Sequence, residues 1–271
     1  MHPARQAVGS GIPPGFSSEA YEIRGVRLDE KHEYFVALPS RAYPYRPAVV
    51  SVHGISRNAR EHAKLLGKLA HQHQVPILAP LFAERWFPDY QRLGASRADL
   101  ALDRILADAQ HRFGLNLNRP ALFGYSGGAQ FCHRYALKNP TRFSKLGLGA
   151  AGWYTFPDRV RAFPHGIRES AAYPQFGADL AQFLRLPIRI VVGALDTERC
   201  FALNRSAKVD LNQGATRIER AIRWAGAIRT AALGMGKVAD LRVRVLPHCE
   251  HCFEQNAGSV LFQQWFNEEI L

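Results

Sequence analysis

The pentapeptide Gly124-Tyr125-Ser126-Gly127-Gly128 is the feature that most constrains the fold of this chain. It follows the apolar run 121–123 and precedes a segment, 129–138, that favours helix. A serine on a tight strand-to-helix turn has a strained backbone, and nearly side-chain-free neighbours let the strand and the helix pack closely. Such a turn exposes the Ser126 hydroxyl and lets the Gly127 N–H face a developing oxyanion. The pentapeptide therefore predicts a nucleophilic serine between a buried strand and a helix.

Apolar runs and helical patterns alternate along the rest of the chain. An antiparallel pair of strands is predicted at 21–27 and 33–38. Short apolar runs are typical of parallel strands that are buried on both faces, and they occur at 48–52, 75–78, 120–123, 146–151, 188–192 and 241–246. Amphipathic spacing predicts helices at 57–73, 97–113, 211–233 and 259–270. We therefore predict a single α/β domain over residues 1–271, with a mostly parallel, doubly wound sheet and helices on both of its faces.

Two segments depart from this alternation. Residues 1–18 are rich in Pro, Gly and Ser and lack the apolar stretch of a signal peptide, so we expect a flexible N-terminal arm. Within residues 154–184 four residues argue against one long helix: Pro157, Pro164, Pro174 and Gly166. We therefore predict that 154–184 form a small lid or insertion after the sixth strand. No apolar run approaches the roughly 20 residues of a membrane span. We expect a cytoplasmic protein that does not bind a membrane.

The chain carries a net charge of +12, from 35 Lys and Arg against 23 Asp and Glu. The positive residues are scattered singly, and no basic stretch is interleaved with aromatic residues. This pattern favours an arginine-rich, solvated surface over attraction of an anionic substrate or of nucleic acid, for which a cluster would be expected. We therefore expect no nucleic-acid partner, and the oligomeric state stays open.

A serine hydroxyl is a poor nucleophile at neutral pH, and it needs a base to take its proton and an acid to orient that base. Asp196 follows the seventh predicted strand, 70 residues after Ser126. The loop 247–252 follows the last predicted strand and holds two histidines, His248 and His251. Asp196 and His251 are the predicted acid and base. The alternatives are Asp158 and Glu198 for the acid and His248 for the base.

A tetrahedral intermediate also needs two N–H groups around its oxyanion. The first is the N–H of Gly127, which directly follows the serine. The loop after the third predicted strand reads His53-Gly54-Ile55, and its glycine lets the backbone approach closely. The N–H of Ile55 is the predicted second donor. We expect His53 to order this loop rather than to take part in the chemistry.

From about residue 48 to its C-terminus the chain resembles the α/β-hydrolase superfamily of serine hydrolases. The resemblance rests on His53-Gly54, the serine pentapeptide, Gly193-Ala194-Leu195-Asp196-Thr197 and His251. The segment that runs from Asp196 through Asn212-Gln213-Gly214-Ala215-Thr216-Arg217 to the histidine loop is similar to a group of uncharacterised bacterial esterase-like hydrolases. These are distantly related to polyhydroxyalkanoate-depolymerase-like esterases.

The resemblance implies the α/β-hydrolase fold and the chain order Ser, Asp, His for the catalytic residues. It favours His251 as the base, because this histidine precedes Cys252-Phe253 and the last helix, as in the family pattern. In that family the loop usually reads Pro-Gly-x-x-His. Here His248 and Glu250 stand where small residues are common, and this is the point at which the chain departs from the pattern.

Aromatic residues follow the fourth and sixth predicted strands. We interpret four of them as an apolar wall for the acyl or alcohol part of a substrate, with core or lid packing as the alternative. They are Phe82, Trp86, Trp153 and Tyr154.

Three of the four cysteines fall in the two loops that are expected to carry the acid and the base. The loops after neighbouring parallel strands open at the same edge of the sheet. Cys200 is therefore predicted to approach Cys249 or Cys252, either as a disulfide or as reduced thiols. Zinc binding by the cysteines and histidines of 248–252 is disfavoured, because catalysis would need two of these groups and no second Cys-x-x-Cys occurs.

Together these patterns predict a serine hydrolase that acts on small-molecule carboxylic esters through an acyl-enzyme and needs no cofactor or metal. Amide or peptide cleavage and acyl transfer can use the same groups, because a fold does not fix its substrate. A hydrolase-like binding module with a disabled site is the alternative outside enzymes.

Overall fold

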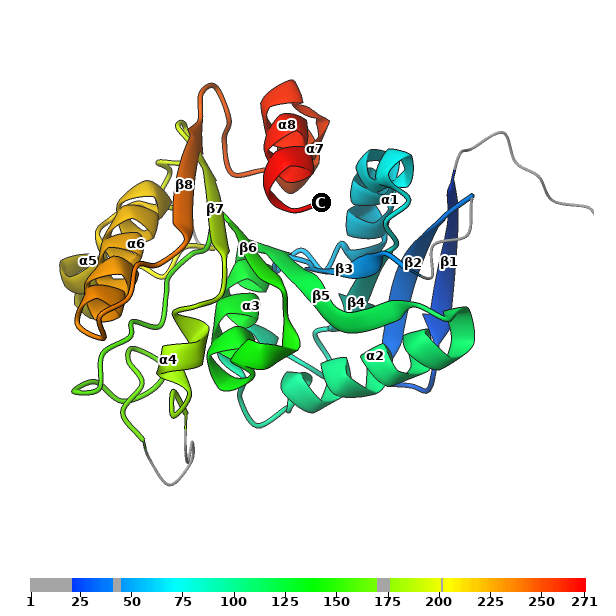
Figure 1. Ribbon diagram of the computed structural model, residues 1–271. Helices are drawn as coiled ribbons and strands as arrows, with labels where there is room; N and C mark the ends of the chain where they lie inside the picture. The colour runs from blue at the N-terminus through cyan, green and yellow to red at the C-terminus, as the bar shows by residue number, and fades with distance from the viewer. Residues whose placement is uncertain (1–20, 41–44, 170–175, 201) are drawn as a thin grey trace, which may run out of the picture.

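The computed structural model describes residues 21–40, 45–169, 176–200 and 202–271 of the chain (Figure 1). The predicted N-terminal arm, 1–18, lies outside the described residues. The described strands form one sheet of eight in the order β1-β2-β4-β3-β5-β6-β7-β8. They are Tyr21–Arg27 (β1), Glu33–Pro39 (β2), Pro47–Val52 (β3), Ile77–Leu81 (β4), Asn116–Tyr125 (β5), Lys145–Gly149 (β6), Ile188–Gly193 (β7) and Leu241–Leu246 (β8).

Only β2 runs against its neighbours, since it is antiparallel to both β1 and β4 while the pairs from β4 to β8 are parallel. The predicted antiparallel pair and the mostly parallel sheet are therefore confirmed. The helices are Ala59–Ala70 (α1), Ala98–Phe113 (α2), Gly127–Lys138 (α3), Leu180–Phe183 (α4), Ala207–Gln213 (α5), Arg217–Leu233 (α6), Phe253–Gly258 (α7) and Val260–Glu269 (α8).

Helices cover both faces of the sheet, as predicted, because the central strands are apolar on both sides (Figure 1). Val50 and Leu122 face one core, which also contains buried residues of α2, α3 and α6. Their neighbours Val49 and Phe123 face the other core, against α1, α7 and α8. Helix α3 lies deepest, since every residue from Gly127 to Leu137 is buried. The central strands are therefore buried on both faces of the sheet.

The predicted helix 211–233 is two helices, α5 and α6. Gly214 ends α5 with a φ of 103°, a conformation that residues with a side chain rarely adopt. Thr216 then starts α6 through a capping box, in which the Thr216 hydroxyl accepts from the Glu219 N–H and the Glu219 carboxylate accepts from the Thr216 N–H. The residues before and after this break both favour helix. In the sequence, only the glycine and the capping box mark the break.

Residues 150–187 connect β6 to β7 and contain the predicted insertion, 154–184. In its described part α4 is the only helix. The start of the insertion is fastened to the helices beneath it. The Thr155 N–H donates to Nε2 of His133 in α3, at 2.9 Å, and the Thr155 carbonyl accepts from Nε1 of Trp224 in α6, at 2.8 Å. That the insertion forms a lid stays a prediction. Within the described residues, no helix is long and apolar enough to cross a membrane.

Candidate active site

Ser126 lies on the turn between β5 and α3 with a φ of 54° and a ψ of −114°. This strained backbone is held by the bond from the Ser126 N–H to the Gly149 carbonyl, at 2.7 Å. Strand and helix approach so closely that a Cβ on Gly124 would lie 2.4 Å from the backbone of Gly128. A Cβ on Gly128 would lie 2.0 Å from the Val52 carbonyl oxygen. The two glycines are therefore required by the close backbone approach at the turn that carries the serine.

Asp196 and His251 lie beside this serine. His251 Nε2 is 3.0 Å from Ser126 Oγ, and His251 Nδ1 is 2.8 Å from Asp196 Oδ2. Asp196 belongs to the turn after β7 and His251 to the loop after β8. The two loops are joined through the backbone, because the N–H groups of Ala194 and Leu195 donate to the carbonyls of Leu246 and Cys249 at 2.8 and 2.9 Å. The structure therefore brings together the three residues that the sequence proposes as nucleophile, base and acid.

The alternatives lie elsewhere. His248 is exposed, with a left-handed backbone, while the ring of Tyr125 stacks on His251 with centroids 5.7 Å apart. Glu198 is also exposed, and Asp158 forms an ion pair with Arg161. Although the loop departs from the family pattern at His248, the histidine beside the serine is His251.

The loop after β3 lies against the start of α3. A Cβ on Gly127 would be 3.4 Å from the Ile55 nitrogen, so the two predicted oxyanion donors belong to adjoining backbone segments. Among the described residues neither N–H has a protein acceptor. His53 orders the loop, as expected. Its Nδ1 bonds to the Gly54 carbonyl at 2.7 Å, and its Nε2 accepts from the Phe82 N–H at 2.9 Å.

No protein-family model matches the chain, and no curated protein is detectably similar in sequence. Solved structures do match it. A poly(3-hydroxybutyrate) depolymerase from Bordetella parapertussis is 25% identical with a TM-score of 0.76, over 93% of this chain and 90% of that one. A poly(aspartic acid) hydrolase from Sphingomonas sp. KT-1 is 21% identical with a TM-score of 0.78, over 93% and 98%. The chain has the α/β-hydrolase fold. An S-formylglutathione hydrolase from Agrobacterium tumefaciens shares this fold at 16% identity and a TM-score of 0.57, over 92% and 95%.

The aromatic residues that the sequence proposes as a substrate wall have different places in this structure. Phe82 and Tyr154 are fully buried in the core. Trp153 is 4% exposed and stacks on the guanidinium of Arg134, 4.3 Å from the ring centroid. Trp86 is partly buried. Core packing, the alternative interpretation, therefore describes Phe82 and Tyr154, and neither ring presents a surface to a substrate in this structure.

All four cysteines of the chain are free thiols, so the disulfide that the sequence left open is not formed. The Cys200 Sγ atom lies 3.9 Å from Nη2 of Arg217, and the Cys252 thiol contacts Glu254. The approach of Cys200 to Cys249 or Cys252 as reduced thiols stays a prediction. The backbone bonds between the acid and base loops hold these loops together without a covalent link. Among the described residues no cluster of three His, Cys, Asp or Glu side chains is placed to hold a metal ion.

Two parts of the site have no motif in the sequence. Arg217, the first residue of α6, donates from Nη1 to Asp196 Oδ1 at 2.8 Å, and both side chains are buried. Asn256 in α7 donates to the Tyr125 hydroxyl at 2.6 Å and to the Glu250 carbonyl at 2.9 Å, and so braces the ring that stacks on His251. The only sequence signal near Arg217 is the similarity of 212–217 to bacterial hydrolases, and this similarity assigns no role to the arginine.

Burial of three histidines should make the stability of this protein sensitive to acid. Burial lowers the pKa of His53 from 6.5 to about 4, and it lowers the pKa values of His62 and His133 well below the usual value. Between the folded and unfolded pKa values the unfolded state binds more protons, so stability falls as the pH drops through this range. For His53 alone the loss is about 3 kcal/mol of the free energy of unfolding.

Denaturant titrations at pH 7, 5.5 and 4.5 measure this effect. The free energy of unfolding should decrease at each step, and a His53→Gln variant should lose less over the same interval. Equal free energies at the three pH values would contradict the assignment of these histidines as buried neutral groups.

Proposed function

We propose that the protein is a serine hydrolase that cleaves carboxylic esters, with Ser126 as nucleophile, His251 as general base and Asp196 as the acid that orients it. The observation that carries the proposal is the unbroken chain of two hydrogen bonds from Asp196 through His251 to Ser126 Oγ. The strained turn beneath the serine supports it, since such strain persists where the surrounding structure enforces it, often at functional sites.

In this mechanism Ser126 Oγ attacks the ester carbonyl while its proton passes to His251 Nε2. The oxyanion that forms accepts from the N–H groups of Gly127 and Ile55. Collapse of the tetrahedral intermediate breaks the bond to the alcohol, which leaves with the proton from His251. Water then attacks the acyl-enzyme with the same base and releases the carboxylic acid and free Ser126. Asp196 holds Nδ1–H of the imidazole throughout, so that Nε2 faces the serine.

The similarity to hydrolases supports this assignment, and a poly(3-hydroxybutyrate) depolymerase is one of the matching solved structures, at 25% identity. Ester, thioester and amide cleavage share the machinery, so the leaving group is tested directly. A panel of chromogenic esters with graded acyl lengths and one matched anilide is offered to the protein, alongside a fluorophosphonate probe that labels activated serines. We expect labelling and ester hydrolysis, with much slower anilide cleavage. A folded protein that neither labels nor cleaves any ester would refute the proposal and favour a binding module.

A further inference from the structure

Among the described residues, two side chains bond to the Asp196 carboxylate, and only one of them is His251. Its Oδ2 faces His251 Nδ1, and its Oδ1 accepts from Arg217 Nη1 at 2.8 Å. The side chain of Asp196 has no exposed surface and that of Arg217 is 1% exposed. We infer that Arg217 is a positioning residue for the reaction, one whose guanidinium fixes the plane of the Asp196 carboxylate so that Oδ2 stays aimed at His251. This inference rests on the proposed function.

The place of Arg217 argues for such a role. It is the first residue of α6, where the helix dipole disfavours a cation. Burial of a cation is costly unless a carboxylate pairs with it, and in this site the partner is the acid of the proposed triad. A carboxylate bound through one oxygen only can rotate about its Cβ–Cγ bond. The bond from Arg217 to the second oxygen opposes that rotation, and so keeps Oδ2 directed at the imidazole of His251.

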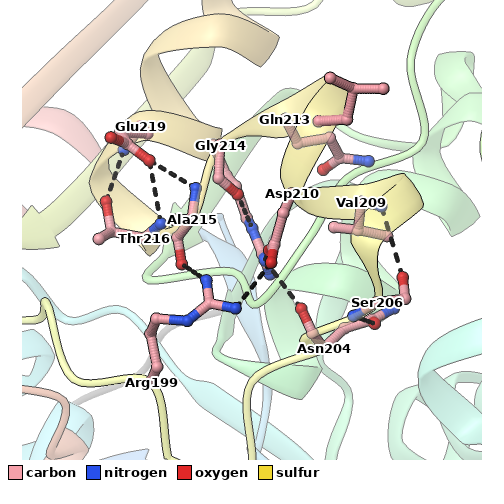
Figure 2. Close-up of polar contacts among 12 residues, drawn as sticks. Arg199, Asn204, Ser206, Val209, Asp210, Gln213, Gly214, Ala215, Thr216 and Glu219 are labelled. Carbon is pink, nitrogen blue, oxygen red and sulfur yellow. Dashed lines mark hydrogen bonds and ion pairs between the residues drawn. The ribbon is translucent and has the colours of Figure 1, made fainter.

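The chain between Asp196 and α6 is built to hold Arg217 in place. Figure 2 shows Arg199 bound to the Ala215 carbonyl at 2.8 Å and to Asp210 at 2.6 Å, which ties the acid loop to the start of α6. The same figure shows the Glu219 carboxylate accepting from the N–H groups of Ala215 and Thr216. The position of α6, and with it the Arg217 guanidinium, is therefore fixed relative to Asp196.

Arg220 provides a matched control one turn along the same helix. Its side chain is fully buried and bonds to Asp210 and to the carbonyls of Gly214 and Asn204. Within the described residues, the Arg220 side chain forms no hydrogen bond with Asp196 or His251. Loss of Arg220 should therefore lower the melting temperature at least as much as loss of Arg217, without the same effect on turnover.

A double-mutant cycle on ester hydrolysis tests the inference with Arg217→Met, Asp196→Asn and the two changes together. We expect Arg217→Met to lower kcat about 10- to 100-fold with KM within about threefold, because only orientation at the reacting centre is lost. Asp196→Asn should lower kcat about 10⁴-fold, and adding Arg217→Met should lower it no further, since the arginine acts through the carboxylate. Arg217→Lys should recover part of the loss, and Arg220→Met should keep kcat within about threefold of wild type.

Three results would overturn the inference: a folded Arg217→Met protein with wild-type kcat, losses that multiply in the double variant, or an equal loss of kcat in Arg220→Met. If Arg217→Met fails to fold, the same cycle is run with Arg217→Lys. This variant must then have a kcat below wild type when residue 196 is aspartate, and must cause no further loss of kcat when Asp196→Asn is also present. A wild-type protein without ester hydrolysis or fluorophosphonate labelling refutes the proposed function instead, and so the two failures are distinguishable.

Discussion

Replacing Ser126 with alanine should lower ester hydrolysis by at least about 10⁴-fold and abolish fluorophosphonate labelling, while the protein stays folded. The reason is geometric. Ser126 Oγ is the atom within 3.0 Å of His251 Nε2, and alanine leaves the base with no proton to accept. Only the oxyanion donors and the substrate contacts would remain. Initial rates on the preferred ester, with circular dichroism to verify folding, measure the effect.

Ser144→Ala is the matched control for this substitution. Ser144 is exposed and lies next to the amino end of β6, whereas Ser126 follows the carboxyl end of β5. The control should keep wild-type rates and labelling. Near-wild-type hydrolysis by a folded Ser126→Ala protein would exclude the proposed mechanism.

Substitution of the two histidines in the last loop should separate their roles. His251→Ala should lower kcat by about 10⁴-fold, because the base and the partner of Asp196 are lost together. His248→Ala should change kcat by less than about threefold, since the exposed His248 side chain is not bonded to Ser126 or Asp196. Steady-state kinetics of both variants on one ester measure the difference. The reverse ranking would mean that His248 is the base and that the loop rearranges when substrate binds.

Much of the fold could be predicted from the sequence because each central strand is a short apolar run with a turn at its end. The position of Ser126 followed from local chemistry, since a tight strand-to-helix turn requires small residues at 124 and 128. The partners Asp196 and His251 followed from the ends of neighbouring parallel strands, which meet at one edge of a sheet.

Contacts between distant segments could not be predicted in the same way. The pairing of Arg217 with Asp196 depends on how α6 is oriented after the break at Gly214, and a pattern of apolar spacing carries no such information. The aromatic residues show a second limit. Phe82 follows the fourth strand at the edge of the sheet where ligands are expected, yet its ring packs inward against His53 and Tyr90. The sequence places such a residue near the site without determining the direction of its side chain.

The burial of α3 from Gly127 to Leu137 has a consequence for mutational scanning of this protein. A helix whose first eleven residues are all buried tolerates few substitutions at those positions, because each change alters packing density in the interior. A growth-based or expression-based screen would therefore score Cys132 or Ala136 as intolerant alongside Ser126, although neither side chain touches the reacting groups. Only a screen that reports abundance and turnover separately can distinguish the residues that do chemistry from those that fill space around them.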